Sequence, residues 1–187
     1  FEFRAISHKQ GMRWLKCSFL SDLTTTGPWL QGILQDVTAH KHAAIREKLS
    51  YELTQHLVSP QALGDTIDKA IELICRNLGW EWGAYWAMDE STPEGPQLVC
   101  MHHWNQKNYD VGAFNEVSHK LTMAPNEGLI GRVWATGNPE WVDDMANDPR
   151  FLRRHSARAC GLMSGYVFPV SYLCADGNAH RPGVLEF

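Results

Sequence analysis

Apolar residues recur at helical spacing in two long stretches of the chain. The stripe of residues 39–57 consists of Ala44, Ile45, Leu49, Leu53 and Leu57. The stripe of residues 63–78 consists of Leu63, Ile67, Ala70, Ile71, Ile74 and Leu78. Both spacings predict amphipathic helices. Asp36 or Thr38 can cap the first helix, Ser59-Pro60 separates the two, and Gly79 ends the second.

Upstream of these helices the apolar pattern has a period of two. Alternation over Phe1–Ile6 and Met12–Phe19 predicts two strands, and Trp29–Thr38 predicts a third that runs into the first helix. Turn residues at His8–Gly11 and Thr25–Pro28 separate them. Three strands joined by short turns form an antiparallel meander.

Downstream of Gly79 the pattern alternates between strands and short helices. Strands are expected at Trp82–Met88, Gln97–Trp104, Gly165–Tyr172 and Pro182–Phe187. Polar loops at Asp89–Pro96 and Ala175–Arg181 join them in pairs, and a helix is expected near Phe114–Leu121. This mixture of antiparallel strands and helices predicts an α+β fold.

Two glycines three residues apart open another short helix. Gly128 and Gly131 lie within an apolar set of helical spacing, made up of Leu129, Ile130, Val133 and Trp134. Gly137, followed by Asn138-Pro139, is the expected C-cap. Alone, a Gly-x-x-Gly motif indicates only a turn that enters a helix.

Composition and charge narrow the function classes. The chain has 187 residues, 44% of them hydrophobic and 20% charged, with a net charge of −4. This balance gives no electrostatic basis for binding nucleic acid or an anionic membrane. No apolar run is long enough to span a bilayer, and the start of the chain is too polar for a signal peptide. Its abrupt ends suggest an excerpt of a larger protein.

Five cysteines without a Cys-x-x-Cys pair favour reduced thiols and a cytoplasmic location.

Candidate catalytic and metal-binding groups are sparse. Strict strand alternation would place Cys100 and His102 on one face and His103 on the other, and two ligands do not make a metal site without others converging. Asp143, Asp144 and Asp148 are interpreted as caps and turns, because a cation loop needs more ligands. No nucleophile elbow, P-loop, kinase or diguanylate-cyclase motif is present, so no metal or catalytic residue is assigned.

An ordered series of motifs resembles the GAF domain of bacterial signalling proteins. The motifs are Leu78–Trp86, Glu127–Gly137, Pro139–Asp144, Asp148–Phe151, Ala157–Gly165, Phe168–Val170 and Gly183–Phe187. The resemblance covers about 59–187, with the C-terminal end truncated. It implies an antiparallel sheet flanked by helices, in a sensory module that binds a small molecule or is purely structural.

The first 38 residues resemble the C-terminal part of a PAS domain. The matching features are His8-Lys9, Gly11, Arg13-Trp14, Gly32 and Asp36–Thr38. An unrelated meander is the alternative, and no PAS cofactor is assigned. The expected organisation is a partial PAS domain at 1–38, a linker helix at 39–58 and a GAF domain at 59–187. The Ala39–Leu57 helix is expected to form a parallel homodimer, with packing on its own domain as the alternative.

The signatures of known GAF ligands are missing. The sequence lacks the cyclic-nucleotide pattern Asn-Lys-x-Phe-Asp-Glu, a bilin-anchoring cysteine and a convincing haem ligand. The cofactor is therefore unknown. A pocket for an unidentified small molecule would be lined by Tyr85, Trp86, His102, Trp104, Val133, Trp134, Trp141, Phe151 and Met163. A filled core could use the same residues.

The resemblance implies a non-catalytic input and relay module of a sensor histidine kinase. The regulatory region of a diguanylate cyclase or phosphodiesterase is the alternative. A GAF-type enzyme such as a methionine-sulfoxide reductase is the competing class. That chemistry needs closely placed reactive thiols, for which only Cys100 and Cys160 are candidates.

Overall fold

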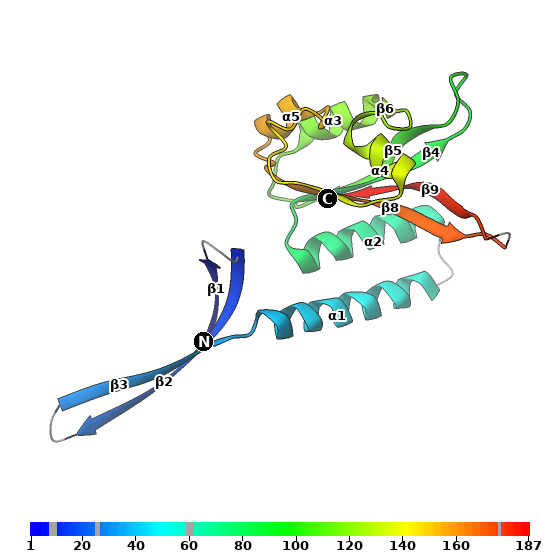
Figure 1. Cartoon of the computed structure of the whole chain (residues 1–187). Coiled ribbons are helices and arrows are strands. Elements are labelled where there is room, and N and C mark those ends of the chain that lie inside the picture. The colour runs from blue at the N-terminus through cyan, green and yellow to red at the C-terminus, as the bar shows by residue number, and fades with distance from the viewer. Residues whose placement is uncertain (8–10, 25–26, 59–61, 176) are drawn as a thin grey trace. The chain divides into compact units, whose positions relative to one another are not determined.

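The computed structural model describes residues 1–7, 11–24, 27–58, 62–175 and 177–187 (Figure 1). The chain forms two compact units, Phe1–Glu52 and Leu53–Phe187. The predicted turns at 8–10 and 25–26, and the helix break at Ser59-Pro60, lie outside the described residues.

The first unit is a three-stranded antiparallel meander followed by a helix. Strands β1 (Glu2–Ser7), β2 (Gly11–Thr24) and β3 (Gly27–Asp36) lie in the order β1-β2-β3, which confirms the predicted meander. Helix α1 spans Thr38–Val58. Asp36 Oδ1 accepts the Thr38 N–H at 2.9 Å, and Thr38 Oγ1 accepts the Trp14 N–H at 2.9 Å. These two bonds fix the start of α1 against the meander.

The second unit is one antiparallel sheet of six strands in the order β6-β5-β4-β9-β8-β7. The strands are β4 (Trp82–Asp89), β5 (Gln97–Asn105), β6 (Thr122–Met123), β7 (Glu140–Val142), β8 (Gly165–Leu173) and β9 (Ala179–Glu186). The helices are α2 (Leu63–Leu78), α3 (Gly112–Lys120), α4 (Gly128–Thr136) and α5 (Arg154–Ala159). The predicted α+β fold, an antiparallel sheet flanked by helices, is confirmed.

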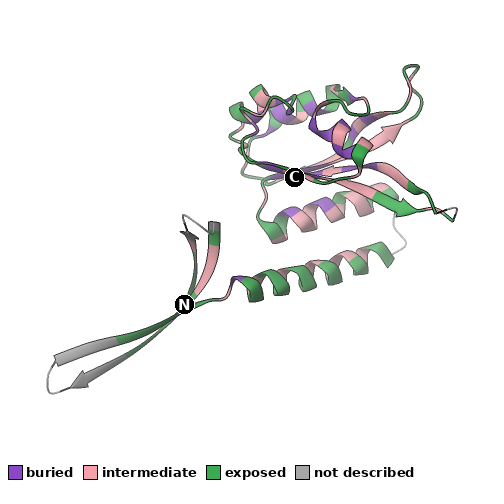
Figure 2. Ribbon diagram, viewed as in Figure 1, coloured by how far each residue is buried: buried purple, intermediate pink, exposed green. Residues whose placement is uncertain are grey.

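Helices cover both faces of this sheet. Figure 1 shows α2 on one face and α3, α4 and α5 on the other. Under α2, the buried side chains Ile71 and Cys75 pack with Phe187. The opposite face carries the larger core, and Figure 2 shows buried residues gathered between the sheet and helices α3–α5. That second core includes Trp86 from the sheet and Val133 from α4.

Steric constraints explain both glycines of the Gly-x-x-Gly motif. Gly128 has φ = 57°, a left-handed conformation that favours glycine. A Cβ on Gly131 would lie 2.2 Å from the Ala124 carbonyl oxygen, so only glycine fits there. At the other end of α4, Gly137 has φ = 73° and donates its N–H to the Val133 carbonyl, as the predicted C-cap requires.

A β-bulge in the β4–β5 pair changes which faces the β5 side chains occupy. The register shifts between Tyr85 and Trp86, so that Tyr85 pairs with His102 but Trp86 pairs with Cys100. Cys100 therefore lies in the core under α3–α5, whereas His102 reaches Asp68 of α2 on the other face. The expectation that Cys100 and His102 share a face is wrong, because the extra residue of a bulge breaks strict alternation.

In the described part of the chain, no helix is long and apolar enough to cross a membrane.

Candidate functional site

A buried ion pair lies at the centre of the core under α3–α5. Arg153 immediately precedes α5, and Glu186 ends β9; they are 2% and 0% exposed. The guanidinium donates through one Nη to Glu186 Oε1 and through the other to Ser118 Oγ at 2.6 Å. Trp86 Nε1 donates to the second Glu186 oxygen at 2.9 Å. Both carboxylate oxygens therefore have partners from elements far apart in sequence.

Four aromatic rings surround the Arg153 guanidinium. Its central carbon lies 4.5 Å from the ring centroid of Phe114, 5.0 Å from those of Trp86 and Phe151, and 5.6 Å from that of Trp82. Among the described residues Nε has no hydrogen-bond partner. The ring faces supply negative electrostatic potential where hydrogen-bond acceptors are lacking. The arrangement is an aromatic cage that already holds a cation.

The predicted pocket residues fall into three groups. Trp86, Val133, Trp134 and Phe151 lie together in the core that contains Arg153. Tyr85 and Trp104 lie on the opposite face, in the α2 core, and His102 contacts α2 through Asp68 at 2.8 Å. Trp141 and Met163 are 50% and 75% exposed. The structure therefore does not bring the nine residues around one cavity.

Two of the cage aromatics, Trp86 and Phe151, belong to the predicted pocket, whereas the buried charges Arg153 and Glu186 were not predicted as site residues. Arginine is rarely fully buried, so a surface position is the default expectation for Arg153. Glu186 stood inside a recognised motif, but its carboxylate received no role. The available signal was the apolar setting of both charges, with Phe151 and Leu152 before Arg153 and Leu185 and Phe187 around Glu186. A buried charge in such a setting needs an opposite charge beside it.

A small cavity of about 70 Å³ lies at the end of the sheet where β4 and β8 begin. Its wall is mostly aromatic, with Trp80, Trp82, Trp141 and Tyr166 beside the carboxylate of Glu81. Ligand pockets for drug-sized molecules measure roughly 300–1,000 Å³. This cavity therefore accommodates water molecules or a small group and not a large planar cofactor.

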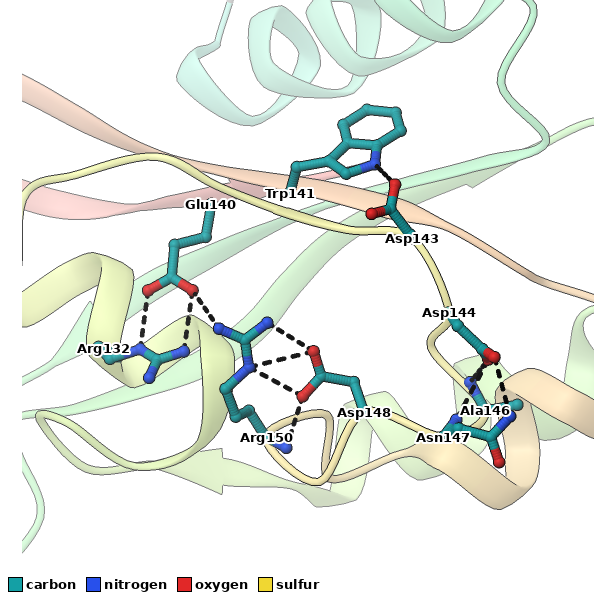
Figure 3. Close-up of polar contacts among 9 residues, drawn as sticks. All are labelled: Arg132, Glu140, Trp141, Asp143, Asp144, Ala146, Asn147, Asp148 and Arg150. Atoms are coloured by element: carbon teal, nitrogen blue, oxygen red, sulfur yellow. Dashed lines mark hydrogen bonds and ion pairs between the residues drawn. The ribbon is translucent and has the colours of Figure 1, made fainter. Parts of the chain in front are cut away.

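A network of ion pairs covers the outside of the same end of the domain. The Glu140 carboxylate lies between the guanidinium groups of Arg132 and Arg150, at 2.7 and 3.0 Å (Figure 3). Arg150 also contacts Asp148 at 2.5 Å, and this hydrogen-bonded contact lowers the pKa of the Asp148 carboxyl to about 2. The network ties α4 and β7 to the segment that leads into α5.

Of the neighbouring aspartates, Asp144 acts as a turn cap, as predicted, whereas Asp143 bonds a side chain. Asp144 Oδ1 accepts the N–H groups of Ala146 and Asn147, and Asp143 accepts the Trp141 Nε1–H at 2.6 Å (Figure 3). Across the described residues, no group of three or more His, Cys, Asp or Glu side chains is arranged to hold a metal ion.

The interior thiols are poorly suited to nucleophilic chemistry. Burial raises the pKa of the Cys100 thiol to about 12, and the nearby Glu186 carboxylate acts in the same direction. Burial also raises the pKa of Cys75 to about 12. A reactive cysteine needs a lowered pKa, because the thiolate is the nucleophile.

The fold and its filled interior define a small α+β domain. The sequence profile of the GAF domain family matches residues 61–174, more than half of the chain. The chain therefore belongs to the GAF domain family, a sensory and regulatory fold of signalling proteins. No curated protein sequence matches the chain.

Solved structures show the same fold at low sequence identity. The nlh2 GAF domain of A. aeolicus in an inactive state is 15% identical with a TM-score of 0.56, over 77% of this chain and 78% of that one. The free methionine-R-sulfoxide reductase of Neisseria meningitidis, in complex with its substrate, is 20% identical with a TM-score of 0.53, over 78% and 73%. The GAF domain of an Acinetobacter phosphoenolpyruvate-protein phosphotransferase is 16% identical with a TM-score of 0.53, over 76% and 75%.

Proposed function

We propose that the chain is a non-catalytic input and relay module of a bacterial signalling protein, of the sensor histidine kinase type. The observation that carries the non-catalytic part is the Arg153–Glu186 pair, because a buried ion pair occupies the interior in place of an accessible reactive group. Membership of the GAF family supports the signalling role. The kinase context rests on the motif resemblance, and the regulatory region of a diguanylate cyclase or phosphodiesterase is its alternative.

The rest of the proposal concerns the organisation of the chain. Residues 1–38 are the end of a PAS domain, supported by the β1–β3 meander and by the motifs from His8 to Thr38. Residues 39–58 are a signalling helix, residues 59–187 are the GAF domain, and the protein acts in the cytoplasm as a dimer through α1. A small-molecule input to the GAF domain is part of the proposal.

The competing class is an enzyme of the methionine-sulfoxide reductase type. The reductase among the solved structures is the observation on its side. A thiol assay separates the two classes. Native protein is treated with iodoacetamide at pH 8, and each cysteine is followed by peptide mass spectrometry. We expect Cys75 and Cys100 to remain unmodified, because both are buried and their thiol pKa is about 12. The partly buried Cys160 and Cys174 should react first.

The same protein is then assayed for reduction of free methionine-R-sulfoxide with a dithiol reductant. We expect no turnover above the buffer rate. Turnover that disappears in a Cys100→Ser or Cys160→Ser variant would establish an enzyme and overturn the non-catalytic proposal.

A further inference from the structure

Two histidines from different elements meet on the face of the sheet that carries α3. His103 lies on β5 and His119 lies near the end of α3. His103 Nδ1 and His119 Nε2 are 3.1 Å apart, and the two rings are steeply inclined, with an interplanar angle of 71°. The bulge at Met101 makes this meeting possible, because it turns His103 toward α3 and His102 toward α2.

The backbone fixes the tautomer of His119. Its Nδ1 lies 3.2 Å from the Cys100 carbonyl oxygen. A carbonyl oxygen only accepts, so Nδ1 carries the proton and Nε2 presents its lone pair toward His103. Metal-bound histidines in proteins almost always donate their second N–H to a carboxylate or a backbone carbonyl in this way. His119 therefore already has the orientation and tautomer of a metal ligand.

The spacing of the two nitrogens suits a shared ion. Imidazole nitrogens lie about 2.0–2.1 Å from a bound zinc ion, so two nitrogens 3.1 Å apart subtend an angle of about 98° at the metal. This value falls between the octahedral and tetrahedral angles. Each ring has only to turn until its lone pair points at the ion, and the His103 proton moves from Nδ1 to Nε2. No proton is lost overall.

The surroundings of His103 favour its neutral imidazole. Partial burial lowers the pKa of the His103 imidazole, and the neighbouring His119 lowers it further. Neutral imidazole is the form that binds metals. His119 is exposed, so an ion reaches the pair from solvent.

We propose that His103 and His119 form a binding site for a late first-row divalent metal ion, with water completing the coordination. Affinity should follow the general order for nitrogen ligands, with Cu²⁺ bound more tightly than Ni²⁺ or Zn²⁺. The bound ion clamps α3 to β5. Ser118, the residue before His119, holds Arg153, so the clamp acts directly beside the buried ion pair. This gives the sensory module a chemical input that the sequence did not indicate.

The test is calorimetric titration of untagged protein with CuCl₂ and ZnCl₂, each compared with the variants His103→Ala and His119→Ala. One equivalent should bind with an affinity at least tenfold higher than in either variant. His102→Ala is the matched control, since His102 neighbours His103 in sequence but contacts Asp68 on the opposite face. It should bind as wild type does. Equal affinity in wild type and in the double variant His103→Ala/His119→Ala would overturn the proposal.

A second measurement needs no variant. Electron paramagnetic resonance of the wild-type protein with one equivalent of Cu²⁺ should show superhyperfine coupling to two imidazole nitrogens. A spectrum with one nitrogen, or one typical of hydrated Cu²⁺, would also overturn the proposal. Either result leaves the signalling role intact, because that role does not depend on a metal.

Discussion

The Glu186 carboxylate holds Arg153 through one oxygen and Trp86 through the other. These bonds join three parts of the domain at one buried point: the end of β9, the middle of β4 and the residue before α5. The pair is almost completely removed from water, so each charge depends on the other for its solvation.

Breaking this pair from one side should be costly. We expect Glu186→Gln or Arg153→Met to lower the free energy of unfolding by about 3–5 kcal/mol, since each leaves an uncompensated or unsatisfied buried group. The double variant Arg153→Met/Glu186→Leu should recover much of that loss. Urea unfolding of the second unit measures all three. Lys120→Ala, which breaks an exposed pair with Glu116, is the control and should cost far less. Equal costs in control and test variants would contradict the assignment.

Two of the four tryptophans of the predicted pocket, Trp134 and Trp141, should differ sharply in their contributions to stability. Trp134 is 8% exposed and donates Nε1–H to the Arg181 carbonyl at 3.0 Å. Replacing it by Ala leaves a void and should cost about 3–5 kcal/mol. Trp141 is 50% exposed, so Trp141→Ala should cost about 1 kcal/mol or less. Thermal or urea unfolding of the two variants gives the comparison, and similar losses would contradict the placement of Trp134 in the core and Trp141 at the surface.

The pairing of Asp148 with Arg150 should make stability depend on pH in the acid range. The pKa of Asp148 falls from 3.8 to about 2 in the folded protein. A lowered carboxyl pKa contributes stability above pH 3.8, and this contribution is lost as the pH falls toward 2. Asp148→Asn should therefore cost about 1 kcal/mol at pH 6, because the pair is partly exposed, and only about a third of that near pH 2.5. Urea midpoints of both proteins at the two pH values test this, and a difference that does not change with pH would refute it.

Regular periodicity explains what the sequence predicted well. Helix α2 has a clean apolar stripe and a glycine stop, and it was predicted to end where it does, at Gly79. The short elements β6, β7 and α5 were missed. A strand of two or three residues or a helix of six is shorter than the window over which a period can be detected.

The site was harder to predict because it depends on contacts between distant residues. Arg153 and Glu186 are 33 positions apart, and no local pattern links them. His103 and His119 are separated by 16 positions, and their meeting depends on a bulge that leaves no mark in the apolar pattern. The domain boundaries and the dimer stay predictions.

The proposal that α1 forms a dimer interface can be tested directly by mutating its apolar stripe. Burying each of Ile45, Leu49 and Leu53 against a second copy is worth about 1.5–3 kcal/mol. A parallel two-fold pair of α1 helices supplies that cover symmetrically. We expect sedimentation to show a dimer for wild type and a monomer for Leu49→Glu/Leu53→Glu, with the circular dichroism of the second unit retained. Arg46→Glu adds negative charge to the same helix outside the stripe and should remain dimeric. A dimeric double variant would place the interface elsewhere.

If α1 relays a signal in the full-length protein, its rotational phase matters more than its length. One inserted residue after Leu49 turns the downstream stripe by about 100°, whereas seven inserted residues turn it by only about 20°. The single insertion should therefore change the output activity far more than the longer one, although the longer one moves the ends further apart. Autophosphorylation, or the activity of whichever output domain follows, measures the effect. Equal effects of the two insertions would mean that the helix is a tether, and the relay role would then have to be assigned to another part of the chain.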